Sequence, residues 1–340
     1  MQFLFAAKDG FQYNRTYILA EGLKELGHDV QYYKIPERQP KYGQVLRDLS
    51  LKADVVLVPP FRHRDLSFVR RYAQAPVVFD PLISRYLTKV VDYGHYWKAP
   101  QKWWIDFRDF RNCDLLLADT AAHLQYFEKT LKLPSSLPKA VVPVGVHLEE
   151  FPAHYPKEND TLEVGFYGTF VPLQGVFTII EAMALLKDEK GLNFTLLGTG
   201  HQYEEARHLA IDCGLSLDIF KGWIPYDELA AQIAKFDLAL GVFGESLKAD
   251  LVVPNKLYHY AASGKAILTK DSPGLREVFE PGLDVLTTEA DPQALADKIR
   301  YLRDHRTELS ALGHKARQRM EASYSKAAIA QRLVDAVEKL

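Results

Sequence analysis

Residues 253–268 read VPNKLYHYAASGKAIL, and the rest of the chain can be interpreted outward from this stretch. Pro254 suits the first turn of a helix, and apolar residues recur at helical spacing after it. Gly264 ends the predicted helix just before a strand from Ala266 to Thr269. A helix N-terminus carries unpaired N–H groups and a partial positive charge, so this one is a natural place for a phosphorylated ligand. An ordinary strand-to-helix connection is the alternative interpretation.

Short apolar runs alternate with helical segments on both sides of this stretch. In the second half of the chain the runs are LEVGFY (162–167), NFTLL (193–197), DIF (218–220), LALGV (238–242), AIL (266–268) and DVL (284–286). In the first half they lie at 1–7, 28–35, 54–59, 76–80, 114–119 and 139–144. Continuous apolar runs separated by helices are typical of parallel strands covered on both faces. Each half is therefore predicted to be a doubly wound, Rossmann-like α/β domain.

Two domains and a terminal helix are expected. The 340 residues exceed what a single hydrophobic core usually covers. Residues 151–161 contain two prolines and mixed charge, which is typical of a linker. We therefore predict an N-terminal domain at 1–150 and a C-terminal domain at 151–320. Residues 321–340 are predicted to form a helix that packs back toward the N-terminal domain.

The composition indicates a soluble, cytoplasmic protein, with 47% hydrophobic and 25% charged residues. No apolar run approaches the length of about 20 residues that spans a bilayer, and the first residues lack the basic start of a signal peptide. Cys113 and Cys213 have neither metal-binding nor redox spacing. The net charge of −2 hides an uneven distribution, because residues 1–150 carry +4 and residues 151–340 carry −6. We expect no nucleic acid partner.

Residues 84–112 interrupt the α/β pattern with many aromatic residues and with six Lys or Arg against three Asp. One interpretation is a segment that docks an acceptor substrate or contacts a membrane surface. In the membrane case Trp97, Trp103 and Trp104 would enter the lipid headgroup region. The favoured interpretation is a helical hairpin that packs its Trp and Tyr side chains onto the sheet.

Several enzyme classes lack support in the sequence. Gly198-Thr199-Gly200 begins like a dinucleotide fingerprint, but Tyr203 stands where its third glycine belongs. No Walker loop, HExxH, GxSxG or paired Cys/His set occurs. A dehydrogenase, nucleotide hydrolysis, zinc chemistry and acyl transfer are therefore disfavoured.

Five motifs, in order, resemble the family 4 (group 1) glycosyltransferases of the GT-B fold over nearly the whole chain. PVGVHLEEF (143–151) is similar to the family's PNGVDxxxF, and FYGTFVPLQG (166–175) to its FVGRLxPxKG. LLGTG (196–200) is similar to VGxG, FKGWIP (220–225) to FxGxV, and the opening stretch to PNKLFEYMAAGKPV. Each motif alone is weak, but five in order are specific.

The resemblance implies two Rossmann-like domains facing a central cleft, with a nucleoside-diphosphate sugar bound by the C-terminal half and the acceptor by the N-terminal half. It implies transfer with retention of configuration and without a metal, and the nucleotide sugar is a substrate, so no cofactor is expected. Expected donor contacts include Gly168, Gly198, Gly200, Asn255 and Leu257. Trp223 and Ile224 are expected to flank the nucleobase.

The chain departs from the family at two cationic positions. Thr169 and Gln174 stand where members typically place the Arg and Lys that contact the donor phosphates. Each charge-assisted hydrogen bond contributes about 1.5–3 kcal/mol, so a replacement is needed. We expect Lys256, at the helix start, and Lys248, in the preceding loop, to supply it, with Lys256 also acting in catalysis by stabilising the departing diphosphate. A plain surface loop is the alternative for Lys248.

The family's Glu-x7-Glu pair is also absent. His259 occupies the position of the second Glu and Leu251 that of the first. His259 is expected to hydrogen-bond the ribose, with a helix histidine packed beside Tyr258 and Tyr260 as the alternative. Glu245 is expected to approach the donor through a looped-out segment.

On the acceptor side, Asp80 ends a strand where related enzymes often carry a polar residue near the reacting sugar. It is the second catalytic candidate, with capping of the next turn as the alternative. Asn14, Arg15, Arg85 and Asp119 are candidate acceptor contacts by position.

We therefore expect a retaining glycosyltransferase that transfers a sugar to a saccharide or lipid-linked acceptor, in the cytoplasm or at the inner membrane face. The alternatives are a non-catalytic GT-B-fold protein that binds sugar nucleotides or glycans, and a sugar-nucleotide epimerase.

Overall fold

The computed structural model describes residues 1–157 and 160–340, so Glu158 and Asn159 of the predicted linker lie outside the described residues. The chain divides into two compact units. One, the N-terminal unit, comprises Met1–Gly145 and Ser323–Leu340, and the other, the C-terminal unit, comprises Val146–Ala322.

The N-terminal unit contains a parallel six-stranded sheet in the order β2-β1-β3-β4-β5-β6. The strands are β1 (Gln2–Ala7), β2 (Asp29–Lys34), β3 (Val55–Val58), β4 (Val77–Phe79), β5 (Leu115–Ala118) and β6 (Lys139–Val141). The helices are α1 (Asn14–Glu25), α2 (Pro40–Ser50), α3 (His63–Tyr72), α4 (Ala99–Asp109), α5 (Ala121–Leu131) and α13 (Lys326–Val337). Every residue of β3, β4 and β5 is buried, as expected for strands covered on both faces.

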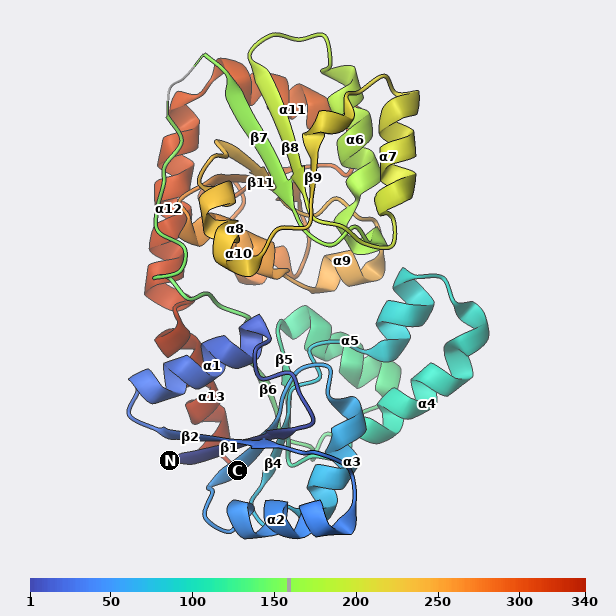
Figure 1. Cartoon of the computed structure of the whole chain (residues 1–340), viewed down its shortest axis with the longest axis vertical. Helices are drawn as coiled ribbons and strands as arrows, with labels where there is room; N and C mark the ends of the chain where they lie inside the picture. Colours follow the sequence, from blue (N-terminus) through green and yellow to red (C-terminus); the bar gives the residue numbers. More distant parts are fainter. Residues whose placement is uncertain (158–159) are drawn as a thin grey trace. The chain divides into compact units, whose positions relative to one another are not determined.

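The C-terminal unit contains a second parallel six-stranded sheet, in the order β12-β11-β10-β7-β8-β9. The strands are β7 (Leu162–Tyr167), β8 (Leu192–Leu197), β9 (Phe220–Gly222), β10 (Leu238–Leu240), β11 (Ala266–Lys270) and β12 (Leu286–Thr288). The helices are α6 (Val176–Leu185), α7 (Tyr203–Asp212), α8 (Tyr226–Ile233), α9 (Leu247–Leu251), α10 (Asn255–Ala262), α11 (Pro292–Asp304) and α12 (Thr307–Ser323). Figure 1 shows α6 packed beside both α7 and α11.

Two predicted strands begin later than expected because side chains form turns at their starts. The hydroxyl of Ser216 accepts a hydrogen bond from Asp218 N, so 217–219 form a 3-10 turn and the strand runs from Phe220 to Gly222. A carboxylate oxygen of Asp284 accepts a bond from Glu280 N at 2.8 Å, and β12 begins only at Leu286. Local side-chain hydrogen bonds of this kind compete with the strand ladder.

The C-terminal run is two helices, with a break at Tyr324 and Ser325. The Ser325 hydroxyl caps α13 by accepting a bond from Ala328 N. Helix α13 packs on α1, where a Cβ atom at Gly22 would lie 2.1 Å from the carbonyl oxygen of Lys326. The glycine therefore permits close contact between these two helices.

Residues 84–112, which we call the arm, are largely helical. They contain a π-helical segment (Leu87–Asp92), a 3-10 turn (Tyr96–Lys98) and α4. The favoured interpretation is right for Trp103, which packs on the core of the N-terminal unit and donates from Nε1 to the carbonyl oxygen of Thr130 at 2.8 Å. It is wrong for Tyr96, Trp97 and Trp104, which are exposed.

Candidate functional site

Glycine-rich loops meet at the carboxyl edge of the C-terminal sheet. Gly198, which follows β8, has a φ of +121°, and a Cβ atom on it would lie 2.0 Å from the carbonyl oxygen of Gly168, which follows β7. Gly168 N donates to Leu197 O at 3.0 Å. A Cβ atom at Gly200 would lie 2.6 Å from Phe170 N. These glycines therefore let the two loops touch backbone to backbone and form one surface.

Helix α10 starts at this edge. Pro254 has extended backbone angles and precedes the helix as its N-cap residue, one position before the start at Asn255, where we expected Pro254 itself to be helical. Asn255 is half-buried in the first turn. The side chain of Leu257 packs beneath Gly241, because a Cβ atom there would lie 2.9 Å from a Leu257 methyl group. The backbone N–H of Leu257 donates to Pro254 O at 3.1 Å, and a donor contact by Leu257 stays a prediction.

Lys256 has a buried side-chain amine at the start of α10. Its side chain is 2% exposed, and Nζ lies 3.4 Å from the carbonyl oxygen of Gly241 and 3.6 Å from the centroid of the Phe166 ring. A Cβ atom at Gly168 would lie 3.0 Å from Nζ, so the amine sits directly against the loop after β7. Within the part of the chain that the structure describes, no carboxylate forms an ion pair with it.

Burial shifts the pKa of Lys256 well below its ordinary value of 10.5. An ammonium group in a poorly solvated place is costly without a counter-ion, and the adjacent helix N-terminus also favours negative charge. The arrangement is therefore suited to an anion that would restore the charge on Lys256.

The two positions at which the chain departs from the resembling family differ in burial. Thr169 is exposed at the loop surface. Gln174 is 7% exposed, and its side-chain oxygen Oε1 has no hydrogen-bond partner among the described residues. An amide oxygen buried without a partner is uncommon, so Gln174 adds a polar group to this edge that a ligand can satisfy.

His259 lies in an aromatic cage. Its ring stacks on Phe151 with centroids 4.1 Å apart and an interplanar angle of 16°, and Nδ1 is 2.6 Å from the hydroxyl of Tyr167. Burial lowers the pKa of His259 to about 3, so the ring is neutral at pH 7. The alternative interpretation of His259 as a packed helix histidine agrees with these contacts. Its partners are Phe151 and Tyr167, whereas Tyr258 and Tyr260 were expected. A ribose contact by His259 stays a prediction.

The residues predicted to flank a base follow β9. Trp223 is 70% exposed and Ile224 is half-buried. Gly198 N donates to Gly222 O at 2.6 Å, which ties this strand end to the glycine loop of β8. An exposed indole beside that loop offers an aromatic face for stacking.

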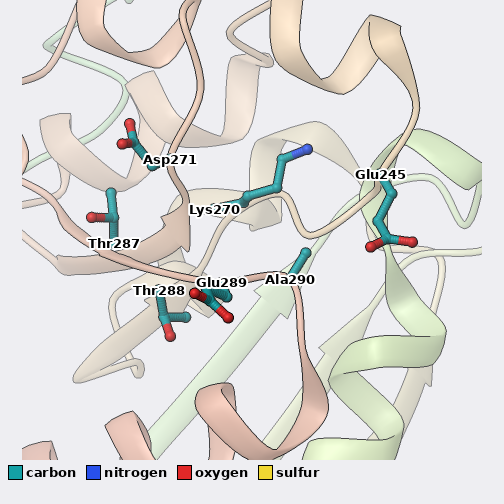
Figure 2. A pocket seen from close by; sticks show the side chains of 7 residues that line it. All are labelled: Glu245, Lys270, Asp271, Thr287, Thr288, Glu289 and Ala290. Carbon is teal, nitrogen blue, oxygen red and sulfur yellow. The ribbon is translucent and has the colours of Figure 1, made fainter.

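A pocket of about 520 Å³ lies at the carboxyl ends of β10, β11 and β12. It is lined by Glu245, Lys270, Asp271, Thr287, Thr288, Glu289 and Ala290, and Figure 2 shows Glu245 on the opposite side from Asp271 and Thr287. Lys270 Nζ donates to Gly244 O and to Asp250 Oδ1, each at 2.7 Å. Lys270 therefore holds the loop that carries Glu245.

Two other positions from the sequence lie in or at the end of the short helix α9. The loop expected around Lys248 is wrong, because Ser246 caps a short helix here; Lys248 lies in that helix and is half-buried. Leu251 is 8% exposed and apolar. Lys270, Tyr167 and Phe151 were not predicted as site residues. Lys270 could have been found from its position at the end of the strand AILTK, because ligands bind at the carboxyl ends of such strands.

In the N-terminal unit, two predicted site residues are paired with each other. Arg15 Nε lies 2.6 Å from Asp80 Oδ2, both side chains are 0% exposed, and Arg15 also donates to Pro143 O at 2.9 Å. Burial raises the pKa of Asp80, and the guanidinium of Arg15 opposes that rise. In this structure a contact between Asp80 and an acceptor requires rearrangement.

The remaining acceptor candidates lie on three different segments of this unit. Asn14 begins α1. Asp119, 4% exposed, follows β5 and lies 2.7 Å from His123 Nδ1. Arg85 lies in the arm, 3.6 Å from Asp109. No group of three or more His, Cys, Asp or Glu side chains suited to a metal ion occurs among residues 1–157 and 160–340.

Known protein structures have the same architecture as this chain. The structure of Anabaena HepE in complex with UDP and glucose superimposes with a TM-score of 0.76 at 14% identity, covering 100% of both chains. Sucrose-phosphate synthase from Thermosynechococcus elongatus gives a TM-score of 0.78 at 16% identity, covering 100% of this chain and 98% of that chain. The chain has the GT-B fold. The predicted fold of two Rossmann-like sheets is thus confirmed.

Two comparisons of sequence point to glycosyltransferases for part of this GT-B chain. Residues 178–335 match a family model described as glycosyl transferase-like. Over 163 residues, 47% of the chain, the sequence is 30% identical to a probable glycosyltransferase, WbjE of Pseudomonas aeruginosa, and the match spans 40% of that relative's length. The matched segment includes Lys256, Trp223 and the lining of the pocket in Figure 2.

Proposed function

We propose that this protein is a retaining, metal-independent glycosyltransferase of family 4 that transfers a sugar from a nucleoside diphosphate to a saccharide or lipid-linked acceptor in the cytoplasm. The five motifs and the glycosyl transferase-like match over residues 178–335 support the class. The observation that carries the proposal is the buried amine of Lys256 at the start of α10, which forms no ion pair with any carboxylate among the described residues.

The departing diphosphate needs positive charge where its negative charge develops. In our proposal Lys256 is protonated when the donor binds and becomes the main cation at the phosphates. The N-terminus of α10 and the Gly168 loop contribute N–H dipoles at the same edge. These groups replace the two cations whose places Thr169 and Gln174 occupy, and Lys248 remains a proposed second cation.

The order of the strands suggests how the donor lies along the carboxyl edge of the C-terminal sheet. Neighbouring strands lie about 4.8 Å apart, so the path β9-β8-β7-β10-β11 covers roughly 19 Å. We propose that the nucleobase stacks on Trp223 beside β9 and that the diphosphate lies at Lys256. The sugar then extends toward Glu245 and the pocket of Figure 2.

Within the N-terminal unit, the proposed acceptor contacts are Asn14, Asp119 and Arg85. We propose that Asp80 acts as a positioning residue. Its ion pair with Arg15 fixes the first turn of α1, which places Asn14.

A thermal-shift screen against UDP, GDP, ADP and CMP and their common sugars tests the donor site. A ligand at a hundred times its dissociation constant stabilises by about 2.7 kcal/mol. The matching donor is then supplied with saccharide and lipid-linked acceptors in EDTA, and the anomeric configuration of the product is read by NMR. If no nucleotide shifts the transition, the donor-site assignment is wrong, and an inverted product contradicts retention.

A non-catalytic, sugar-nucleotide-binding protein is the second candidate. It is favoured by Leu251 and His259, an apolar and a neutral residue at the positions of the family's two carboxylates. Nucleotide-sugar binding without hydrolysis or transfer across the donor panel would select this candidate, whereas turnover with any acceptor excludes it.

A further inference from the structure

The arm presents aromatic side chains to solvent. Trp97 is 73% exposed, Tyr96 70% and Trp104 59%. Tyr96 and Trp97 lie in the 3-10 turn that precedes α4, and Trp104 lies within α4, so two consecutive elements of the arm expose aromatic rings. Trp103 points to the core instead. Figure 1 shows α4 in a part of the chain that stands clear of the N-terminal sheet.

The acidic side chains of the arm are buried, whereas several of its basic side chains are not. All three of its carboxylates are buried, with Asp92 7%, Asp106 0% and Asp109 1% exposed. Asp106 accepts bonds from Ser84 Oγ and Tyr86 N, each at 2.8 Å, so its charge is used internally. Asp109 is held by Arg108 at 2.7 Å.

Four of the six cations of the arm lie at least partly in solvent. Lys89 and Arg108 are exposed, and Lys98 and Lys102 are half-buried, with Lys98 Nζ 5.5 Å from the Trp97 ring centroid. Arg85 pairs with Asp109, and Arg111 donates to backbone carbonyl oxygens, so these two are engaged within the unit. The other four cations give the surface of the arm its positive charge, beside three exposed aromatic rings.

We propose that the arm docks this protein on the interface of an anionic phospholipid bilayer. Tyr and Trp rings prefer the headgroup level of a membrane, and Lys and Arg beside them are attracted to anionic lipids. A neutral glycan would use the rings but gain nothing from the cations, so the charge sorting favours the lipid surface. Across residues 1–157 and 160–340, none of the helices has the length and apolarity that crossing a bilayer requires, so the proposed contact is peripheral. The inference does not depend on the proposed transferase activity.

Flotation of the full chain with lipid vesicles, without nucleotide, tests this proposal. Vesicles of phosphatidylcholine alone are compared with vesicles that contain about one-third phosphatidylglycerol. We expect binding only to the anionic vesicles, with release at high salt. Each lysine near the surface contributes about fivefold in partitioning, so Lys98→Gln/Lys102→Gln should lower binding about 25-fold. Trp97→Ala/Trp104→Ala should also abolish most of the binding.

Matched controls come from exposed positions elsewhere in the same unit. Lys41→Gln/Lys52→Gln makes the same change in charge, and Leu51→Ala removes an apolar side chain that is 66% exposed. Both controls should bind as the wild type does, and melting curves confirm folding of every variant. Equal binding to neutral and anionic vesicles, or equal losses in the arm and control variants, would overturn the proposal. So would arm variants that keep vesicle binding but lose binding of a soluble glycan.

Discussion

Lys256 links ligand binding to protonation because its amine is buried without an acidic partner among the described residues. Its pKa in the folded protein lies well below the unfolded value of 10.5. Between those two values the unfolded chain holds one more proton than the native one. Stability therefore rises with pH through this window, by up to about 1.4 kcal/mol per pH unit.

Lys256→Met should remove that pH dependence. The variant is expected to be more stable than the wild type at low pH, with the difference shrinking as pH rises. Urea unfolding of both proteins from about pH 6 to pH 9 measures this, with the exposed Lys52→Met as control. A stability difference that stays constant over the range contradicts a depressed pKa.

Asp80 and Arg15 form a buried ion pair, so removing one partner leaves the other charge uncompensated. Asp80→Asn is expected to destabilise the protein by about 3–5 kcal/mol, and Arg15→Met/Asp80→Asn should recover part of that loss. Thermal unfolding compares these two variants with the wild type. If Asp80→Asn abolishes turnover but leaves stability unchanged, Asp80 acts directly in catalysis and our positioning role is wrong.

At the scale of elements, the glycine contact between the loops after β7 and β8 shapes the carboxyl edge of the C-terminal sheet, where we propose that the donor binds. Gly198→Ala should place a Cβ atom 2.0 Å from Gly168 O, which forces the loops apart. We expect a loss of several kcal/mol and of nucleotide binding. Gly282→Ala is the control, since it has a similar positive φ of +83° but no atom within 4 Å, and it should cost only about 1 kcal/mol. Equal losses in the two variants would show that backbone strain alone matters.

Sequence patterns predicted the alternation of strands and helices because buried parallel strands are continuously apolar. The patterns missed the late starts of β9 and β12, where hydrogen bonds of Ser216 and Asp284 compete with the ladder. Motif spacing placed Lys256 at the start of the helix on the carboxyl edge of the C-terminal sheet, but nothing in the pattern indicated that its amine would be buried.

The site features that the sequence did not predict arise from contacts between distant segments. Tyr167 is separated from His259 by 92 residues, and Lys270 from Asp250 by 20, so their partnerships arise only from the order of strands in the sheet. The arm shows a similar limit. Trp103 and Trp104 are adjacent and of the same residue type, yet Trp103 packs on the core and Trp104 is exposed. The difference depends on which face of α4 packs inward, and composition alone does not show that.

At the scale of the whole molecule, residues 323–340 complete the N-terminal unit. Ile329, Leu333 and Val334 of α13 are buried, and each contributes roughly 1.5–3 kcal/mol. Truncation after Ala322 should therefore unfold the N-terminal unit at a lower temperature while the C-terminal unit still binds nucleotide. Calorimetry should resolve two transitions, and Gly22→Val in the full chain should reproduce the effect. A single unchanged transition in the truncated chain contradicts this assignment.

The central claim is that Lys256 receives a proton and holds the donor diphosphate. Calorimetric titration with UDP, GDP and ADP at about pH 8, in buffers of different ionisation enthalpy, tests it most directly. We predict that the preferred nucleotide binds the wild type with proton uptake, and that Lys256→Met loses this uptake and about 10- to 150-fold in affinity. Nucleotide affinity within twofold of the wild type in Lys256→Met, with the same proton uptake, would contradict the claim.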